Sequence, residues 1–204
     1  MKRQISSESA RGEEPAARNV GATRAEQTKI LTVAGRNAPV IQFTVATGLR
    51  VSEVVKLEWG DIRDASATIS SKGKRRSVPL IQVALGALQV VPRHVSYPRV
   101  FWWLKTRNYA YEAFVRAERD AGVSGYTFHH LRHTYASWSA MAGCDFHALA
   151  KNMGISSLMV LRRYAHLSPS YRRSEAQKLS EFWGTQAAQV TDKSPTNNQS
   201  SQNL

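Results

Sequence analysis

The pattern of apolar and polar positions predicts short helices, the first two of which meet at a corner. Residues 38–47 are mostly apolar, with a proline suited to the first turn of a helix, and Gly48 ends the run. A second helix is expected over residues 49–57, where Glu53 suits the positive end of the helix dipole. Arg50 therefore lies at the corner between the two helices. It either makes a specific contact there or is an ordinary surface arginine.

A strand pair follows, over residues 67–71 and 75–80. Between the strands, Gly73 supplies the positive φ that a tight turn needs. The basic residues at the turn and on the returning strand are Lys72, Lys74, Arg75 and Arg76. Such a hairpin is either a solvated charged surface or a finger that lies against a phosphate backbone.

The rest of the chain predicts further helices with apolar stripes. They are expected over residues 81–91, 108–121, 129–141, 146–152 and 171–183. One more helix is expected to begin after Ser156 and Ser157, which can cap it. The aromatic run at 100–104 is expected in the core, with stacking on bases as the alternative. The last helix has an apolar stripe formed by Ala176, Leu179 and Phe182. This stripe either closes the molecule's own core or packs against a neighbouring molecule.

Both ends of the chain lack a sustained apolar period. Residues 1–28 are polar and mixed in charge, so we expect a flexible N-terminal arm. Residues 185–204 are rich in Gln, Asn, Ser and Thr, so we expect a disordered tail. A single domain is therefore expected over residues 29–184.

The charge favours a polyanionic partner. The 204 residues include 28 Lys and Arg against 15 Asp and Glu, a formal net charge of +13. Nucleic acid suits that charge first and an anionic membrane second, with a merely basic soluble protein as the alternative. The single cysteine, Cys144, allows no internal disulfide. Without a membrane-length apolar run or a signal peptide, we expect a soluble cytoplasmic protein.

Two stretches concentrate the candidate chemistry. Residues 126–138 carry three histidines and an arginine close together, namely His129, His130, Arg132 and His133. A guanidinium and imidazoles at the start of a helix suit a phosphate group. In residues 162–167, Tyr164 follows Arg162 and Arg163 and could be a hydrogen-bond donor, a base-stacking ring or a nucleophile.

Other chemistries fit the sequence less well. His129 and His133 have the i, i+4 spacing of a two-histidine metal site, but no convincing third ligand accompanies them. The chain has neither a Gly-rich phosphate loop nor a nucleophile elbow, which disfavours nucleotide hydrolysis and serine or cysteine hydrolases. What remains is a phosphodiester site that uses no metal and no cofactor. In such a site, arginines stabilise the charged transition state, a tyrosine attacks phosphorus, and a lysine or histidine transfers protons.

Four boxes within residues 40–168 carry a more specific signal. They are Ala46–Glu53, Lys72–Lys74, His129–Thr134 and Arg163–Leu167. In order and spacing they resemble the catalytic boxes of the tyrosine recombinases, the phage integrase family. The resemblance implies a mainly α-helical catalytic domain with a small antiparallel β-sheet, an α+β fold that surrounds DNA.

The resemblance also implies roles for the matched positions. The catalytic matches are Arg50, Lys72, His129, Arg132 and Tyr164. In the family these are the first arginine, the general-acid lysine, a histidine that assists proton transfer, the second arginine and the nucleophile. Lys74 is the alternative general acid, and Glu53 matches a residue that supports the first arginine. The expected DNA-binding residues are Lys74, Arg75, Arg76, Arg162 and Arg163.

The function implied by the resemblance is site-specific DNA recombination. Tyr164 would cleave one strand of double-stranded DNA, leaving a 3′-phosphotyrosyl link and a free 5′-hydroxyl. A partner strand would reverse the attack, without metal or ATP because the covalent link conserves the bond energy. The family further implies a tetramer of protomers on DNA, in the cytoplasm of a prokaryotic cell or phage-infected host.

Three departures from the family pattern keep an alternative open. Ile155 stands where the family usually has a histidine that donates to the phosphate, and His130 stands where it often has an acidic residue. With roughly 40 residues before the first box, we expect no separate DNA-gripping domain of the kind that family members usually carry upstream. The alternative is a catalytically impaired DNA-binding remnant or a modulator of a full-length recombinase, and a strand-relaxing enzyme of the topoisomerase IB kind is a related rival.

Overall fold

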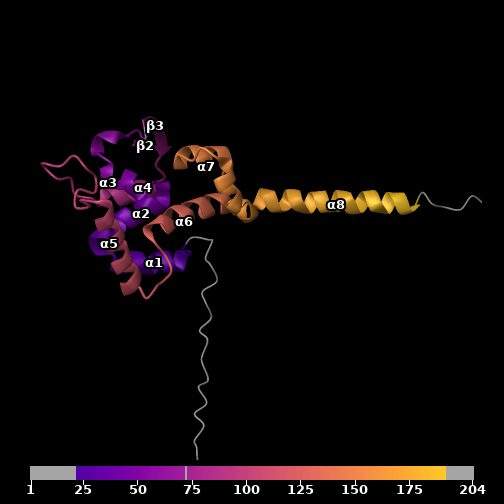
Figure 1. The fold of residues 1–204 in the computed structure, drawn as a ribbon, viewed down its shortest axis with the longest axis horizontal. Coiled ribbons are helices and arrows are strands. Elements are labelled where there is room, and N and C mark those ends of the chain that lie inside the picture. Colours follow the sequence, from indigo (N-terminus) through magenta and orange to yellow (C-terminus); the bar gives the residue numbers. More distant parts are fainter. Residues whose placement is uncertain (1–21, 72, 192–204) are drawn as a thin grey trace, which may run out of the picture.

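The computed structural model describes residues 22–71 and 73–191. The fold is mainly helical with one small antiparallel sheet, as expected (Figure 1). The helices are α1 (Arg24–Val33), α2 (Ala38–Thr47), α3 (Val51–Lys56), α4 (Gln82–Gln89), α5 (Arg107–Asp120), α6 (Phe128–Met141), α7 (Phe146–Met153) and α8 (Pro169–Thr191). The 3₁₀ segments are η1 (Gly35–Asn37), η2 (Trp59–Asp61) and η3 (Leu158–Leu167), and the strands are β1 (Ile62–Arg63), β2 (Ser66–Ser71) and β3 (Lys74–Pro79).

Helix α2 lies at the centre of the fold, in contact with α1, α4 and α6. It spans the predicted residues 38–47 and is buried over most of its length, which is why its sequence is apolar on every side. Gly48 ends it in the left-handed conformation at φ 65°. Arg50 then takes the N-cap position of α3, so the predicted corner between the two helices is confirmed.

The sheet contains the predicted hairpin and one additional strand. β2 and β3 pair antiparallel, with Ser71 opposite Lys74 and Gly73 in the turn at φ 74°. β1 precedes them and pairs with β2 through a turn in which Asp64 and Ala65 have positive φ. No glycine marks that turn, so its sequence carries no strong turn signal.

Two apolar clusters form the interior. The larger one lies among α1 to α6 and the sheet, and it includes the aromatic run, with Phe101 fully buried, as the sequence predicts. The smaller one lies between α6, α7 and η3. Its members are Ala136, Ala140, Leu149, Ala150, Met153, Leu161 and Tyr164. A tyrosine proposed as nucleophile is therefore part of a small core.

The ends of the chain differ from the expected boundaries. The arm was expected through residue 28, but α1 already begins at Arg24, with a capping box between Thr23 and Glu26. The buried Ala22 donates its N–H to Thr134 Oγ1 over 2.9 Å. The tail was expected from residue 185, but α8 continues to Thr191. The expected arm at 1–21 and tail at 192–204 lie outside the described residues.

Helix α8 projects away from the rest of the molecule (Figure 1). Leu179, Phe182 and Trp183 are each more than half exposed, so of the two alternatives left open by the sequence, the structure does not show this helix closing the molecule's own core. Its stripe remains available for a neighbour. Within the described chain, no helix combines the length and the apolar content that crossing a membrane requires.

The corner at Gly48 predicts a large effect of a small substitution. A Cβ at this glycine would collide with the ring of Tyr135, in addition to the strain of the positive φ. We expect Gly48→Ala to lower the free energy of unfolding by about 2–4 kcal/mol, the sum of backbone strain and overpacking. Chemical denaturation measures the loss. Gly143→Ala is the control, because Gly143 has φ 77° but open space around its Cβ position; equal losses in the two variants would contradict the collision.

Candidate active site

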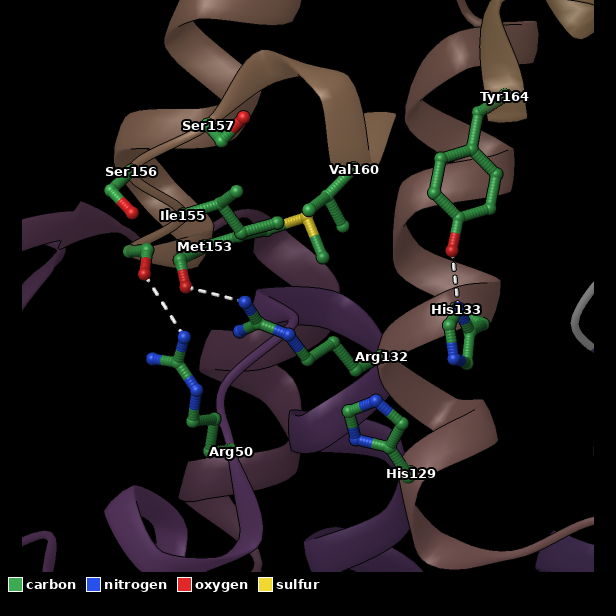
Figure 2. Close-up of a pocket in the computed structure, with 11 residues that line it drawn as sticks. Arg50, His129, Arg132, His133, Met153, Ile155, Ser156, Ser157, Val160 and Tyr164 are labelled. Carbon is green, nitrogen blue, oxygen red and sulfur yellow. Dashed lines mark hydrogen bonds between the residues drawn. The ribbon is translucent and has the colours of Figure 1, made fainter. Parts of the chain in front are cut away.

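A cavity of about 320 Å³ lies where α3, α6, the end of α7 and η3 meet (Figure 2). Its lining residues are Arg50, His129, Arg132, His133, Met153, Gly154, Ile155, Ser156, Ser157, Val160 and Tyr164. Among the described residues, the lining has arginines and histidines but no carboxylate, so it suits an anion. Residues more than 100 positions apart in the chain are brought together here.

Arg132 links the ends of two helices. Its Nη1 donates to the carbonyl of Gly48 over 2.6 Å, and its Nη2 to the carbonyl of Met153 over 2.7 Å. These carbonyls belong to the negative C-terminal ends of α2 and α7, where a cation is favourable. Burial, with the charge of Arg50 nearby, lowers the pKa of Arg132 to about 10, so the guanidinium stays charged at neutral pH.

Arg50 reaches the same cavity from the start of α3. Its Nη2 donates to the carbonyl of Gly154 over 3.0 Å, and its Nη1 lies 3.3 Å from Glu53 Oε1. The side chain is 41% exposed, so part of the guanidinium faces solvent in the cavity. Each of the two cavity arginines has more N–H groups than these bonds use, which leaves donors for the oxygens of a bound anion.

Arg76 was expected to contact DNA, but in the structure its side chain has protein partners. The side chain turns inward and is 13% exposed. Its two Nη atoms donate to the carboxylate of Glu53 over 3.0 and 2.9 Å, and its Nε donates to the carbonyl of Asn152 over 3.0 Å. A Cβ at Gly154 would lie 2.9 Å from the guanidinium carbon, so a side chain there would displace Arg76 in addition to the strain of the positive φ. Arg76 is therefore a structural residue that joins β3, α3 and α7.

Glu53 balances this group of cations. Burial alone raises the pKa of its carboxyl, but hydrogen bonds from the Arg76 side chain and the Arg50 backbone, with both positive charges, hold it below its usual range. The carboxylate is 3% exposed and is shared by the two arginines. Removing it would leave buried positive charge without a counter-ion, which is costly.

Tyr164 and His133 meet at the side of the cavity formed by α6 and η3 (Figure 2). The tyrosine is 2% exposed and its hydroxyl is hydrogen-bonded to Nδ1 of His133. Burial raises the pKa of Tyr164, although Arg163 and Arg132 lower it in part. Burial also lowers the pKa of His133 to about 4, helped by the charges of neighbouring histidines.

His129 and His133 lie close together on α6. Their rings meet edge to face with centroids 4.8 Å apart. Burial, followed by the charge of Arg132, lowers the pKa of His129 as well. The sequence had shown the i, i+4 spacing of these histidines only as a possible metal site and gave His133 no role of its own. Its contact with Tyr164 depends on the packing of η3 against α6, which no local pattern encodes.

The other predicted residues that the structure describes lie outside the cavity. Lys72 is not among the described residues. Lys74 and Arg75 are exposed on the hairpin, and Arg162 and Arg163 are exposed on η3. The cavity therefore brings together Arg50, His129, Arg132 and Tyr164, with Ile155 at the position that differs from the family pattern. None of the expected DNA-binding residues lines it.

Comparison with known sequences finds relatives that are all integrases or tyrosine recombinases. The sequence model of the phage integrase family matches residues 24–170. The chain is 31% identical over 183 residues to the integrase of Salmonella phage P22, covering 78% of this chain and 47% of that protein. It is 26% identical over 169 residues to tyrosine recombinase XerC of Bifidobacterium longum (strain DJO10A), covering 72% and 48%. The chain thus spans about half the length of these curated relatives.

Solved structures share the fold. The crystal structure of XerA recombinase matches with a TM-score of 0.65 at 21% identity, covering 78% of this chain and 65% of that chain. The catalytic domain of bacteriophage HP1 integrase matches with a TM-score of 0.63 at 23% identity, covering 78% and 94%. A lambda integrase tetramer bound to a Holliday junction matches with a TM-score of 0.57 at 22% identity, covering 67% and 47%. The fold is that of a tyrosine recombinase catalytic domain.

The depressed pKa of Glu53 predicts pH-dependent stability. A carboxyl with a lowered pKa contributes stability above its unfolded value, near 4.5, and the contribution is lost as pH falls through the folded value. We expect Glu53→Gln to lower the free energy of unfolding by about 3–5 kcal/mol at pH 7, because it leaves the largely buried guanidinium of Arg76 without its counter-ion. Below pH 4.5 the native protein loses the same ion pairs, so its advantage over the variant shrinks.

Urea denaturation at pH 7 and at lower pH measures this difference. Glu175→Gln is the control, since Glu175 pairs with Lys178 on the exposed surface of α8 and should matter little. A Glu53→Gln deficit of the same size at pH 7 and well below pH 4.5 would show that the charge of Glu53 is not responsible.

Proposed function

Because this chain belongs to the phage integrase family, we propose that it is the catalytic domain of a tyrosine-type, site-specific DNA recombinase. The observation that carries the proposal is the cavity, where two arginines, a histidine and a tyrosine from three of the four boxes share one surface suited to an anion. Those residues are Arg50, Arg132, His129 and Tyr164. The relatives favour this activity over an impaired DNA-binding remnant.

The proposed reaction exchanges one phosphodiester bond for another. Arg50 and Arg132 donate hydrogen bonds to the non-bridging oxygens of the scissile phosphate, which stabilises charge in the transition state. The hydroxyl of Tyr164 attacks phosphorus and forms a 3′-phosphotyrosyl link. Lys72, or alternatively Lys74, protonates the departing 5′-oxygen, and His129 assists proton transfer.

Rejoining is the reverse of cleavage. The 5′-hydroxyl of a partner strand attacks the phosphotyrosyl link and releases Tyr164. The energy of the broken bond is kept in the covalent link, so the cycle needs neither ATP nor a metal ion. The proposal therefore includes no cofactor.

The proposed partner is double-stranded DNA. Exposed basic side chains on the hairpin and on η3 supply contacts to the phosphate backbone, namely Lys74, Arg75, Arg162 and Arg163. Arg76 is excluded from this set because Glu53 and the α7 carbonyl occupy it. The net charge of +13 supports the same partner.

We further propose assembly of four protomers on DNA. The support is the exposed apolar surface of α8, which includes Leu179, Phe182 and Trp183 and is suited to packing against a neighbouring protomer. Lambda integrase, which has the same fold, forms a tetramer on a Holliday junction. The reaction would take place on DNA in the cytoplasm of a prokaryotic or phage-infected cell.

Replacement of the nucleophile tests the activity directly. The protein is incubated with nicked duplexes that tile the DNA flanking its gene, because a nick lets the cleaved strand diffuse away and traps the covalent intermediate. We expect a protein–DNA adduct that resists denaturation and is absent with Tyr164→Phe. Gel electrophoresis of labelled DNA measures it. Tyr171→Phe, at an exposed tyrosine on α8, is the control and should keep the adduct. An adduct that persists in Tyr164→Phe would reject Tyr164 as the nucleophile.

Ile155 predicts a gain of rate on substitution. This residue is half-buried in the cavity wall and brings a side chain that cannot donate a hydrogen bond to a phosphate. We expect Ile155→His to speed adduct formation by up to about 10²-fold, the low end of the effect of one transition-state donor. Single-turnover kinetics measure the rate. Ile155→Val is the control and should leave it unchanged; equal rates in both variants would show that no donor is needed at this position.

A further inference from the structure

The nucleophile proposed above already has a proton acceptor beside it. Tyr164 and His133 both line the cavity, and the tyrosine hydroxyl is hydrogen-bonded to His133 Nδ1 (Figure 2). In the described part of the chain, this is the one hydrogen bond recorded for that hydroxyl. His129, which the family pattern assigns to proton transfer, instead packs its ring against His133.

A buried tyrosine needs help to lose its proton. A phenol ionises near pH 10 in water, and burial raises the pKa of Tyr164. At pH 7 fewer than about one molecule in 10³ would carry the phenolate. Attack by a preformed phenolate would therefore be slow, and removal of the proton during attack avoids this limitation.

We propose that His133 is a catalytic residue that accepts the proton of Tyr164 while the tyrosine oxygen attacks phosphorus. The inference rests on the recombinase function proposed above and adds to it the base for the nucleophile. The phenol O–H is a stronger donor than the N–H of a neutral imidazole, so the hydroxyl donates and Nδ1 accepts. His133 then carries its own proton on Nε2.

The step balances in atoms and charge. The Tyr164 Oη–phosphorus bond forms and the bond from phosphorus to the 5′-oxygen breaks. The hydroxyl proton moves to His133 Nδ1, and the 5′-oxygen leaves with a proton from the lysine general acid assigned above. On rejoining, Tyr164 leaves phosphorus and takes a proton back from His133, because the same path runs in reverse.

The surroundings of His133 keep it neutral before substrate binds. The titratable and charged groups that face it are His129, His130 and Arg132 on α6, with Arg163 and Tyr164 on η3. None of these is a carboxylate, and burial with these charges lowers the pKa of His133 to about 4. A bound phosphodiester would bring negative charge into the cavity and raise that pKa, so His133 becomes a better base when substrate is present.

The experiment follows the rate of Tyr164 adduct formation against pH on the nicked duplexes described above. The native protein should show a nearly constant rate from about pH 6 to 9, because His133 is neutral throughout. His133→Asn keeps a hydrogen-bond acceptor but cannot take the proton. We expect its rate to fall by about 10²–10⁴-fold at pH 7 and to rise about tenfold per pH unit, as attack comes to depend on free phenolate.

His130→Gln is the matched control. His130 lies on the same helix and accepts the Thr127 N–H over 2.9 Å without contacting Tyr164, and glutamine can also cap the helix start. This variant should keep the constant profile. Thermal unfolding of each variant checks that the fold is intact, because a merely structural role for His133 would lower stability without changing the slope against pH.

The outcomes separate this inference from the function on which it rests. A normal adduct through Tyr164 with a pH-independent His133→Asn rate overturns the inference and leaves the recombinase intact. An adduct that Tyr164→Phe retains, or no adduct from the native protein on any duplex, overturns the proposed function and the inference with it. A pH-dependent rate confined to His133→Asn supports both.

Discussion

The site depends on three guanidinium groups that bind the C-terminal end of α7. Arg50, Arg76 and Arg132 donate to the successive carbonyls of residues 152–154. Helix ends leave carbonyls without intrahelical partners, and cations there oppose the negative end of the dipole. Arg50 and Arg76 lie on elements that pack in the larger cluster, whereas α7 packs in the smaller one. These bonds therefore fix how the two clusters are placed on either side of the cavity. Glu53 makes the arrangement possible by holding Arg50 and Arg76 with one buried carboxylate.

The two sides of the cavity have different physical characters. The side with Arg50 and Arg132 presents charge that is anchored to backbone carbonyls and so changes little in position. The opposite side presents Tyr164, held in a small apolar cluster and by one hydrogen bond. Rigid charge suits the stabilisation of a transition state. The tyrosine is instead positioned by packing, with its hydroxyl directed at His133.

The cavity is a site of concentrated positive charge. Burial, together with nearby cations, lowers the pKa values of Arg132, His129 and His133, and among the described residues no carboxylate lines the cavity. A phosphodiester would relieve this repulsion on binding. The repulsion among these cations in the free protein therefore favours binding of an anionic substrate. The exposed basic residues of the hairpin and of η3 extend the positive potential beyond the cavity.

The sequence by itself determined the elements whose signals are local, and the tertiary structure decided the contacts between them. The bounds of α2, the hairpin turn at Gly73 and the boxes that meet in the cavity could be predicted, because apolar periodicity, glycine and fixed spacing act within a few residues. The inward turn of Arg76 and the pairing of His133 with Tyr164 could not. A basic residue on an exposed strand looks the same in sequence whether its partner is phosphate or a buried carboxylate 23 positions away. Only the packing of distant segments chooses between them, because a buried charge takes the partner that the fold brings within hydrogen-bonding distance.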